Sequence, residues 1–128
     1  MTSFPTDLRY TTDHEWLRAA GSAWRVGITQ FAVDQLGDIT LVDLPKQGDT
    51  VTKGARFGTI ESVKSVSDLY APVSGKVIAI NPTLKDSPEQ VNTDPYGAGW
   101  MVKLEMTNPA ELNNLLDDAA YKAFLVTL

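Results

Sequence analysis

The sequence predicts a mainly β domain, a small barrel or sandwich of short strands with short helices at its edges and C-terminal end. Three observations support this. Short apolar runs alternate with turn residues along most of the chain, as in small all-β domains. The hydrophobic spacing becomes helical only after Asn108. Apolar residues make up 43% of the 128 residues, enough for one core without disulfides, so we expect one domain over residues 1–128.

The first half of the chain predicts strands around one short helix. Thr29 fits the N-cap of a helix over Phe31–Leu36, and Gly37 fits its end. The flanking segments alternate or are bounded by glycine and proline turns, as strands are. The predicted strands are Ala23–Ile28, Ile39–Leu44 and Gly48–Gly54.

Two further apolar runs lie on either side of Lys64, and we expect the two strands around this lysine to form an exposed hairpin. The runs are Ala55–Ile60 and Leu69–Ile80. Val63 and Val66 lie close to the lysine, and no Asn-Gly or Gly-Asn pair forms the turn, which is unusual for a hairpin tip. Such a tip is suited to presenting the lysine amine to other molecules.

The C-terminal third predicts one more strand and then short helices. Ser87 and Pro88 fit the N-cap and first position of a short helical turn, and Trp100–Met106 is the last strand. Asn108–Glu111 fits a capping box, and Asp118 fits the cap of a final helix over Ala119–Leu125. The helical packing face is made by Leu112, Leu115 and Leu116.

Composition excludes several classes of function. The formal net charge is -5 and no basic stripe interrupts it, which disfavours nucleic acid and anionic membranes as partners. There is no cysteine, so there is no disulfide framework or thiolate metal site, and His14 is the only histidine. The glycines of Gly97–Gly99 do not fit a phosphate-binding loop. Residues 1–10 fit neither a signal peptide nor a transit peptide, and no apolar run approaches about 20 residues. Because the chain has no cysteine, we expect a cytoplasmic protein.

These exclusions leave Lys64 as the main chemical handle of the chain. Taken alone, a lysine among valines and serines is usually an exposed residue whose stem covers apolar neighbours. Its place at the predicted tip, with no competing nucleophile or metal cluster, favours a carrier protein over a self-sufficient enzyme.

Several separate motifs of the chain resemble one family, the glycine cleavage system H protein. Its lipoyl-attachment region resembles Glu61–Lys64, Ser67–Asp68 and Tyr70–Gly75. The other motifs occur in the family's order and are His14–Trp16, Val26–Thr29, Gln35–Asp38, Asp86–Glu89, Val91–Asn92 and Asp94–Trp100. The resemblance covers about residues 8–124, the expected core, and implies a hammerhead-like flattened barrel, the barrel-sandwich hybrid of lipoyl domains.

The resemblance implies a non-catalytic carrier with lipoate joined covalently to Lys64. The lipoyl arm would accept an aminomethyl group from the pyridoxal-phosphate glycine decarboxylase (P protein). It would pass the group to the tetrahydrofolate-dependent aminomethyltransferase (T protein) and be reoxidised by dihydrolipoamide dehydrogenase (L protein). A lipoyl or octanoyl transferase or ligase would attach the arm. The chemistry then belongs to the cofactor and the partners.

The resemblance also implies roles for four further residues. Glu61 and Gly75 resemble positions used in recognition by the ligase, and Glu15 and Asp68 resemble residues beside the cleft that shelters the loaded arm. Each has a plainer interpretation from the residues alone. Glu61 would be a solvated strand charge, Gly75 a turn glycine with positive φ, and the other two exposed carboxylates.

Two neighbouring residues and three rival functions complete the prediction. We expect His14 to be a packed surface histidine, and Gln35 stands where some relatives have a polar ring side chain such as histidine. Biotin carriers usually have Met on both sides of the lysine, whereas Val63 and Ser65 stand here. Lipoyl domains of 2-oxo-acid dehydrogenases are shorter and typically have Asp before the lysine. A lipoyl relay that serves other enzymes, a biotin-type carrier and an unmodified interaction domain remain as alternatives.

Overall fold

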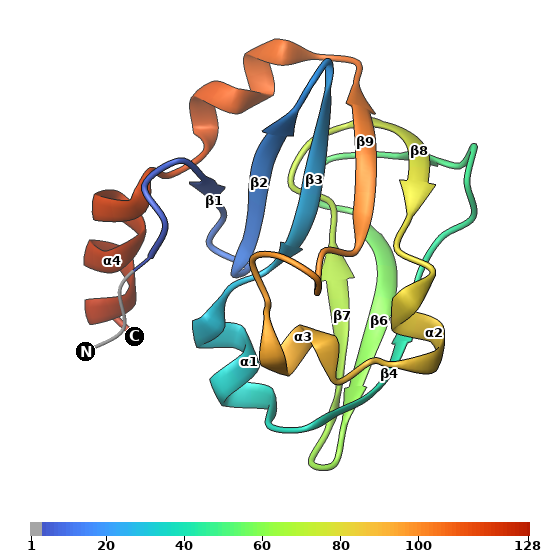
Figure 1. Ribbon diagram of the computed structural model, residues 1–128. Helices are drawn as coiled ribbons and strands as arrows, with labels where there is room; N and C mark the ends of the chain where they lie inside the picture. Colours follow the sequence, from blue (N-terminus) through green and yellow to red (C-terminus); the bar gives the residue numbers. More distant parts are fainter. Residues whose placement is uncertain (1–3) are drawn as a thin grey trace.

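A computed structural model describes residues 4–128 as two antiparallel sheets with short helices around them (Figure 1). The predicted mainly β, flattened-barrel class is confirmed, although the two sheets do not close into one barrel. A six-stranded sheet, here sheet A, has the order β1-β2-β3-β9-β8-β5, and a three-stranded sheet B has the order β4-β6-β7. The strands are β1 (Arg9–Tyr10), β2 (Glu15–Ala20), β3 (Ala23–Ile28), β4 (Ile39–Asp43), β5 (Thr50–Val51), β6 (Arg56–Ser62), β7 (Val66–Tyr70), β8 (Gly75–Ile80) and β9 (Val102–Met106).

Sheet A begins with a hairpin that the sequence did not predict. Strands β2 and β3 pair over their full length, and Ala20 lies opposite Ala23. Gly21 closes the two-residue turn between them with φ 67°, a conformation that glycine adopts without steric cost. Strand β2 therefore places Glu15 and Trp16 next to β3, whose predicted range Ala23–Ile28 is confirmed.

Sheet B carries the predicted lysine hairpin. Strands β6 and β7 pair antiparallel, and in Figure 1 their tip extends below α1 and α3. The apolar run predicted after the lysine is not one strand. It divides into β7 and β8, because Ala71–Ser74 turns the chain from sheet B to sheet A. Pro72 suits this break, since proline cannot donate to a strand ladder.

The helices are short and differ from the prediction at several ends. Thr29 caps α1 as predicted, accepting a hydrogen bond from the backbone N–H of Ala32. The helical turn predicted at Ser87 and Pro88 is present, since the Ser87 carbonyl accepts from the N–H of Gln90 at 3.1 Å. Ser87 also ends α2, and α3 itself begins after Glu89. The last helix is capped by Asp117, one residue before the predicted cap. The helices are α1 (Gln30–Leu36), α2 (Thr83–Asp86), α3 (Gln90–Thr93), the 3-10 helix η1 (Pro109–Asn114) and α4 (Asp118–Val126).

The predicted capping box at Asn108 is only half correct. The Asn108 side chain does accept a hydrogen bond from the N–H of Ala110. The Glu111 carboxylate, however, is 2.7 Å from the backbone nitrogen of Ser74 and 3.0 Å from its hydroxyl oxygen. Glu111 thus ties η1 to the segment between β7 and β8, a long-range contact that local sequence spacing does not reveal.

Three apolar clusters form the core. One lies between sheet B and helices α1, α2 and α3, a second joins the two sheets, and a third packs α4 and the N-terminal segment on sheet A. We call the third the aromatic cluster, made of Leu8, Tyr10, Trp16 and Tyr121. The first contains Ile28, Val33, Ile39, Val42, Ile60, Leu69, Leu84, Val91 and Met101. The second contains Leu17, Val26, Val51, Ala71, Val73, Val77, Val102 and Leu104.

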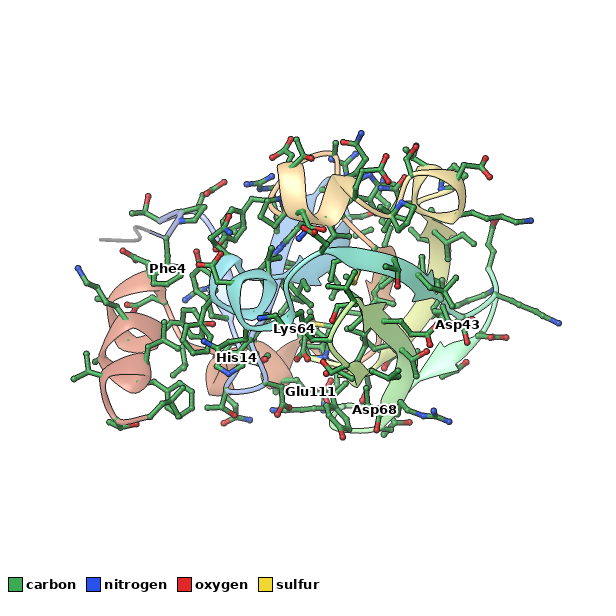
Figure 2. All side chains as sticks on the ribbon, turned by 90° about the horizontal axis from the view of Figure 1, so that it is seen from below. Phe4, His14, Asp43, Lys64, Asp68 and Glu111 are labelled. Atoms are coloured by element: carbon green, nitrogen blue, oxygen red, sulfur yellow. The ribbon has the colours of Figure 1, made fainter. Side chains whose placement is uncertain are left out.

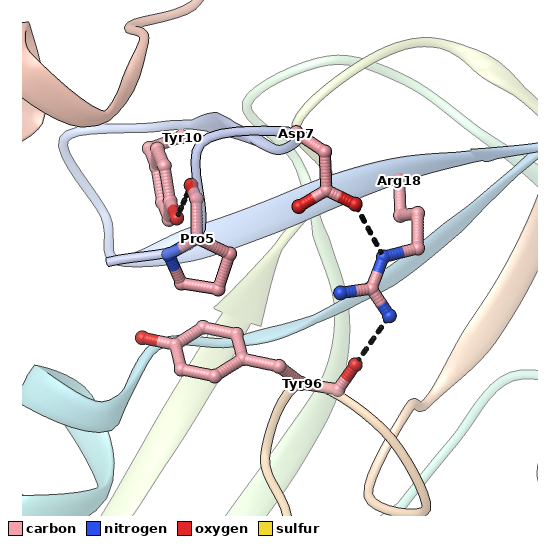
Figure 3. Close-up of polar contacts among 5 residues, drawn as sticks. All are labelled: Pro5, Asp7, Tyr10, Arg18 and Tyr96. Atoms are coloured by element: carbon pink, nitrogen blue, oxygen red, sulfur yellow. Dashed lines mark hydrogen bonds and ion pairs between the residues drawn. The ribbon is translucent and has the colours of Figure 1, made fainter. Parts of the chain in front are cut away.

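Polar contacts hold the N-terminal segment onto sheet A (Figure 3). The Tyr10 hydroxyl donates to the carbonyl of Pro5 at 2.6 Å. Arg18 donates to the carbonyl of Tyr96 at 2.6 Å and lies 3.4 Å from the Asp7 carboxylate. These contacts fix the entry of the chain into β1 and so support the turn that precedes Glu15.

Candidate functional site: a lysine hairpin beside a cleft

The hairpin tip is closed by the side chain of Ser62. Its hydroxyl oxygen accepts hydrogen bonds from the backbone N–H groups of Lys64 and Ser65, both at 3.2 Å. The backbone N–H of Ser62 donates to the carbonyl of Ser65 at 2.8 Å. A serine hydroxyl can form such a local turn, which explains why the tip needs no Asn-Gly pair. Lys64 is exposed, as predicted.

The tip rests on the loop that follows α1. The N–H of Val63 donates to the carbonyl of Asp38 at 3.0 Å. The Lys64 stem lies so close to Gly37 that a Cβ added there would be 3.2 Å from Lys64 Cε. Figure 2, which views this end of the molecule from below, shows Lys64 beside α1. The lysine therefore leans toward the C-terminal end of α1 rather than projecting straight from the hairpin.

Asn92 of α3 holds the same loop in place. Its side-chain amide donates to the carbonyl of Gly37 at 2.8 Å and accepts from the N–H of Ile39 at 2.9 Å. The Val91–Asn92 motif thus has a structural reason: it fixes the surface against which the lysine lies. Gly37 and Asn92 are site residues to which the sequence reasoning assigned no role toward the lysine, although both lay within the motifs it quoted.

A cleft of about 630 Å³ lies alongside α1 and the lysine hairpin. Its volume is in the range of small-molecule sites. One wall is α1, a second is β7 with part of β6, and the third is the turn before β2. The lining residues are Thr12, Asp13, His14, Glu15, Ile28, Phe31, Ala32, Gln35, Leu36, Ile60, Ser67, Asp68, Leu69, Tyr70 and Leu128. The α1 wall ends at Leu36, directly before the glycine that contacts the lysine stem.

Glu15 lies in the cleft wall but is 2% exposed, so the plainer prediction of an exposed carboxylate is wrong. Burial raises the pKa of Glu15 to about 8. The Thr11 hydroxyl, which donates a hydrogen bond to the carboxylate at 2.8 Å, lowers this pKa, and the nearby charge of Asp13 raises it. A buried carboxyl with a raised pKa is protonated at neutral pH. It would ionise readily beside a cation, which makes it a receptor for a positively charged group.

His14 is held in a strained turn at the edge of the cleft. Its φ is 68°, the left-handed region that side chains other than glycine rarely adopt. Its Nδ1 lies 2.8 Å from the Tyr121 hydroxyl, which also lies 2.8 Å from Thr29 Oγ1. Burial lowers the pKa of His14. It is half-buried as expected of a packed histidine, and it connects α4 to the cleft.

The other predicted site residues divide between two ends of the molecule. Asp68 lines the cleft with Glu15, is exposed, and lies 3.8 Å from Arg56. Glu61 is on β6 opposite Val66, close to the lysine. Gly75 instead begins β8, beyond the end of β7 that is far from the tip (Figure 1).

Gly75 does not have the predicted positive φ, since only four other glycines of residues 4–128 do. A Cβ there would lie 2.5 Å from the carbonyl oxygen of Glu105 on β9. The glycine is therefore required by the close approach of two strands, which is a different reason from the one expected.

Within residues 4–128, no group of three or more His, Cys, Asp or Glu side chains could hold a metal ion. No helix in this range is long and apolar enough to cross a bilayer.

The family model for the glycine cleavage H-protein matches residues 8–128. A glycine cleavage system H protein of Symbiobacterium thermophilum is 56% identical over 97% of each chain, and one of Listeria monocytogenes is 54% identical over 96% of this chain and 98% of its own. The crystal structure of a glycine cleavage system H protein from Mycobacterium marinum superposes with a TM-score of 0.88 at 41% identity, covering 98% of this chain and 100% of that chain. The chain belongs to the glycine cleavage H-protein family, the carrier component of that system.

Proposed function

We propose that Lys64 is the site of covalent lipoyl attachment and that the chain serves as the mobile carrier of the glycine cleavage system. The observation that supports this most directly is an exposed lysine on a serine-closed tip, next to an acid-containing cleft, in a chain of this family. Attachment forms an amide between Nζ and the lipoyl carbonyl. The bond from that carbonyl to its activating group breaks, and the amine releases a proton.

The residues of the cleft fit the proposed arm. Its walls include apolar side chains from α1 and sheet B, among them Ile28, Phe31 and Leu69, which suit an aliphatic chain. Carboxyl groups at Glu15 and Asp68 suit a cationic end. The arm would leave the tip along Gly37, where the missing side chain gives the lysine stem its space.

The bound lipoyl group would supply the disulfide that accepts an aminomethyl unit from glycine decarboxylase, passes it to the aminomethyltransferase and is reoxidised by dihydrolipoamide dehydrogenase. The residues of this chain would attach, orient and shelter it. Glu15 would ionise as an ammonium group arrives and form a charge-assisted hydrogen bond with it. Asp68 would provide a second acceptor at the cleft edge.

We further propose that Glu61 contributes to recognition by the lipoyl ligase or transferase. Its position on β6, three residues before the lysine, puts it within the surface that such an enzyme has to contact. Gly75 would act indirectly, because its closeness to Glu105 fixes the spacing of β8 and β9. The ligase would then lipoylate a Gly75→Ala variant more slowly, because the added Cβ displaces β8.

Intact mass spectrometry tests the attachment. After incubation of the purified chain with lipoate, ATP and a lipoate ligase, we expect the gain of one lipoyl group. Lys64→Arg keeps the charge and the fold but should gain nothing, while Lys85→Arg, at another exposed lysine, should be modified like the wild type. An unmodified wild-type mass, or modification of the Lys64→Arg variant, would overturn the proposal.

Isotope exchange tests the place of the carrier in the system. The lipoylated chain, mixed with glycine decarboxylase, glycine and labelled bicarbonate, should transfer label into the carboxyl group of glycine. The unlipoylated chain should not support this at a comparable rate. Full lipoylation without exchange would favour the alternative of a relay that supplies lipoyl groups to other enzymes.

A further inference from the structure

Exposed apolar residues lie on the outer face of sheet B and in the lysine tip next to it. Leu41, Val63 and Val66 are 48%, 67% and 63% exposed. The strand register aligns two of them, since Leu41 on β4 lies opposite Glu61 on β6, which lies opposite Val66 on β7. Directly paired residues of antiparallel strands point to the same side. Leu41, Glu61 and Val66 therefore form one row across the sheet.

A second row on the same side is acidic. Asp43, Thr59 and Asp68 are paired across the same three strands, two positions further from the tip. Side chains two positions apart on a strand share a face, so the two carboxylates of this row lie beside the apolar one, and both are exposed. Figure 2 labels Asp43 and Asp68 at this side of the molecule.

The apolar residues on the opposite side of sheet B are buried. Val42, Ile60 and Leu69 alternate with the residues above and are buried in the core. The apolar residues of the outer face are therefore not part of the packing that holds the domain together. None of Leu41, Val63 and Val66 lines the cleft, but Asp68 of the acidic row does, so this face adjoins the proposed shelter of the arm at that residue.

We propose that Leu41, Glu61, Val63 and Val66 form the docking face for the enzyme that acylates Lys64, an inference that rests on the proposed function. Acylation makes a bond at Nζ itself. The catalytic centre of that enzyme must therefore reach the lysine side chain, and its surface has to contact residues immediately around the tip. Enzymes that act on the far end of a loaded arm meet no such requirement.

The charges of the face define the complementary surface. Glu61 stands between two apolar side chains, and the neighbouring row adds Asp43 and Asp68. The partner surface would have an apolar pocket for Leu41 and Val66 with Lys or Arg around it, because opposite charges at an interface favour encounter and orientation. Leu41 comes from a strand well before the hairpin in sequence, so a peptide that contains only the lysine motif lacks part of the face.

Steady-state acylation by an ATP-dependent lipoate ligase tests the docking face. Leu41→Ser and Val66→Ser should each lower kcat/KM by about tenfold, mainly through KM, as loss of an apolar interface contact does. The matched control is Val126→Ser, since this valine is 82% exposed on α4, away from the tip. Circular dichroism should show unchanged folding in all three, because exposed substitutions rarely alter stability.

The outcomes separate the two proposals. With excess ligase, the wild type and every variant should reach full lipoylation, which shows that attachment itself is intact. The docking face is wrong if Leu41→Ser and Val66→Ser keep the wild-type kcat/KM, or if they are slowed only in exchange with glycine decarboxylase after lipoylation. A wild-type chain that is never modified would overturn the proposed attachment, and the docking face with it.

Discussion

The lysine hairpin and the aromatic cluster use large apolar residues in opposite ways. At the tip, Val63 and Val66 are mostly exposed. In the aromatic cluster, Tyr10, Trp16 and Tyr121 are fully buried, and the two tyrosine rings stack with their centroids 4.8 Å apart. The difference indicates that the stability of the fold is built away from Lys64, the proposed attachment site. Acylation at the tip, as proposed, would then have little effect on the fold.

We expect the largest loss of stability from a substitution in the aromatic cluster. Trp16→Ala removes a buried ring whose Nε1 donates to the carbonyls of Ile28 and Pro95, both at 3.0 Å. It also empties the space above Gly27, which the ring covers. We expect the free energy of unfolding to fall by about 3–5 kcal/mol, measured by urea denaturation.

The matched substitution at the tip is Val63→Ala. Because Val63 is exposed, its loss should change the free energy of unfolding by no more than about 0.5 kcal/mol. Equal costs for the two alanine variants would show that the tip is part of the stabilising core and that the contrast is wrong.

The cleft lies between these two regions, and Glu15 should make it sensitive to pH. Its pKa rises from 4.5 in the unfolded chain to about 8 in the folded one. Between these values the folded state binds more protons, so the free energy of unfolding should fall as pH rises, by up to about 1.4 kcal/mol per pH unit. This stabilising contribution is complete below pH 4.5 and lost as pH passes 8.

Comparison with Glu15→Gln isolates that contribution. Glutamine keeps the size of the side chain and an acceptor for the Thr11 hydroxyl, but it does not titrate. The difference in unfolding free energy between the two proteins should therefore change steadily from pH 5 to pH 8, in favour of the variant at high pH. Asp68→Asn, at an exposed carboxylate, serves as the control. A pH-independent difference for Glu15→Gln would show that Glu15 is ionised throughout.

Gly37 connects the lysine to the rest of the domain, and its replacement should have a moderate effect. Gly37→Ala forces a side chain into φ 80° and places its Cβ 3.2 Å from Lys64 Cε. Because φ 80° with ψ -152° is a conformation essentially restricted to glycine, we expect a loss of about 1–3 kcal/mol and a displaced lysine stem. Chemical-shift changes at Lys64 should accompany the loss of stability. Gly48→Ala, at φ 98° with open space around it, controls for the strain alone; similar shifts at Lys64 in both variants would contradict the contact.

The sequence predicted the parts of this structure that local signals determine. The cap at Thr29, the end of α1 at Gly37 and the strand Ala23–Ile28 depend on neighbouring residues, and all are confirmed. Strand β2 was missed because Glu15–Ala20 contains no β-branched residue, and its pairing with β3 overrides its weak strand propensity. The Gly21-Ser22 pair before Ala23 was the available hairpin signal.

In the candidate site, too, local sequence predicts some features and tertiary contacts determine the others. Lys64 could be singled out because exposure at a tip follows from the two flanking runs. The burial of Glu15 could not be predicted from its neighbours, since it depends on packing of the Thr11–Glu15 turn with residues far away in sequence. The same holds for the Tyr121 hydroxyl, which joins His14 and Thr29 across the fold. Local patterns indicate where chemistry is placed, whereas the environment of a side chain depends on tertiary contacts.

A small local effect sharpens the comparison at the tip itself. Ser62→Ala removes the hydroxyl that accepts hydrogen bonds from the N–H groups of Lys64 and Ser65. Because these groups are exposed to water, the free energy of unfolding should fall by only about 0.5–1 kcal/mol. Amide hydrogen exchange at the two N–H groups should nevertheless become faster while exchange in the aromatic cluster stays unchanged. Ser67→Ala, on β7, should leave the tip amides as they are. Unchanged exchange in Ser62→Ala would mean that the backbone alone holds the lysine in place, and global acceleration would mean that the tip and the aromatic cluster unfold together.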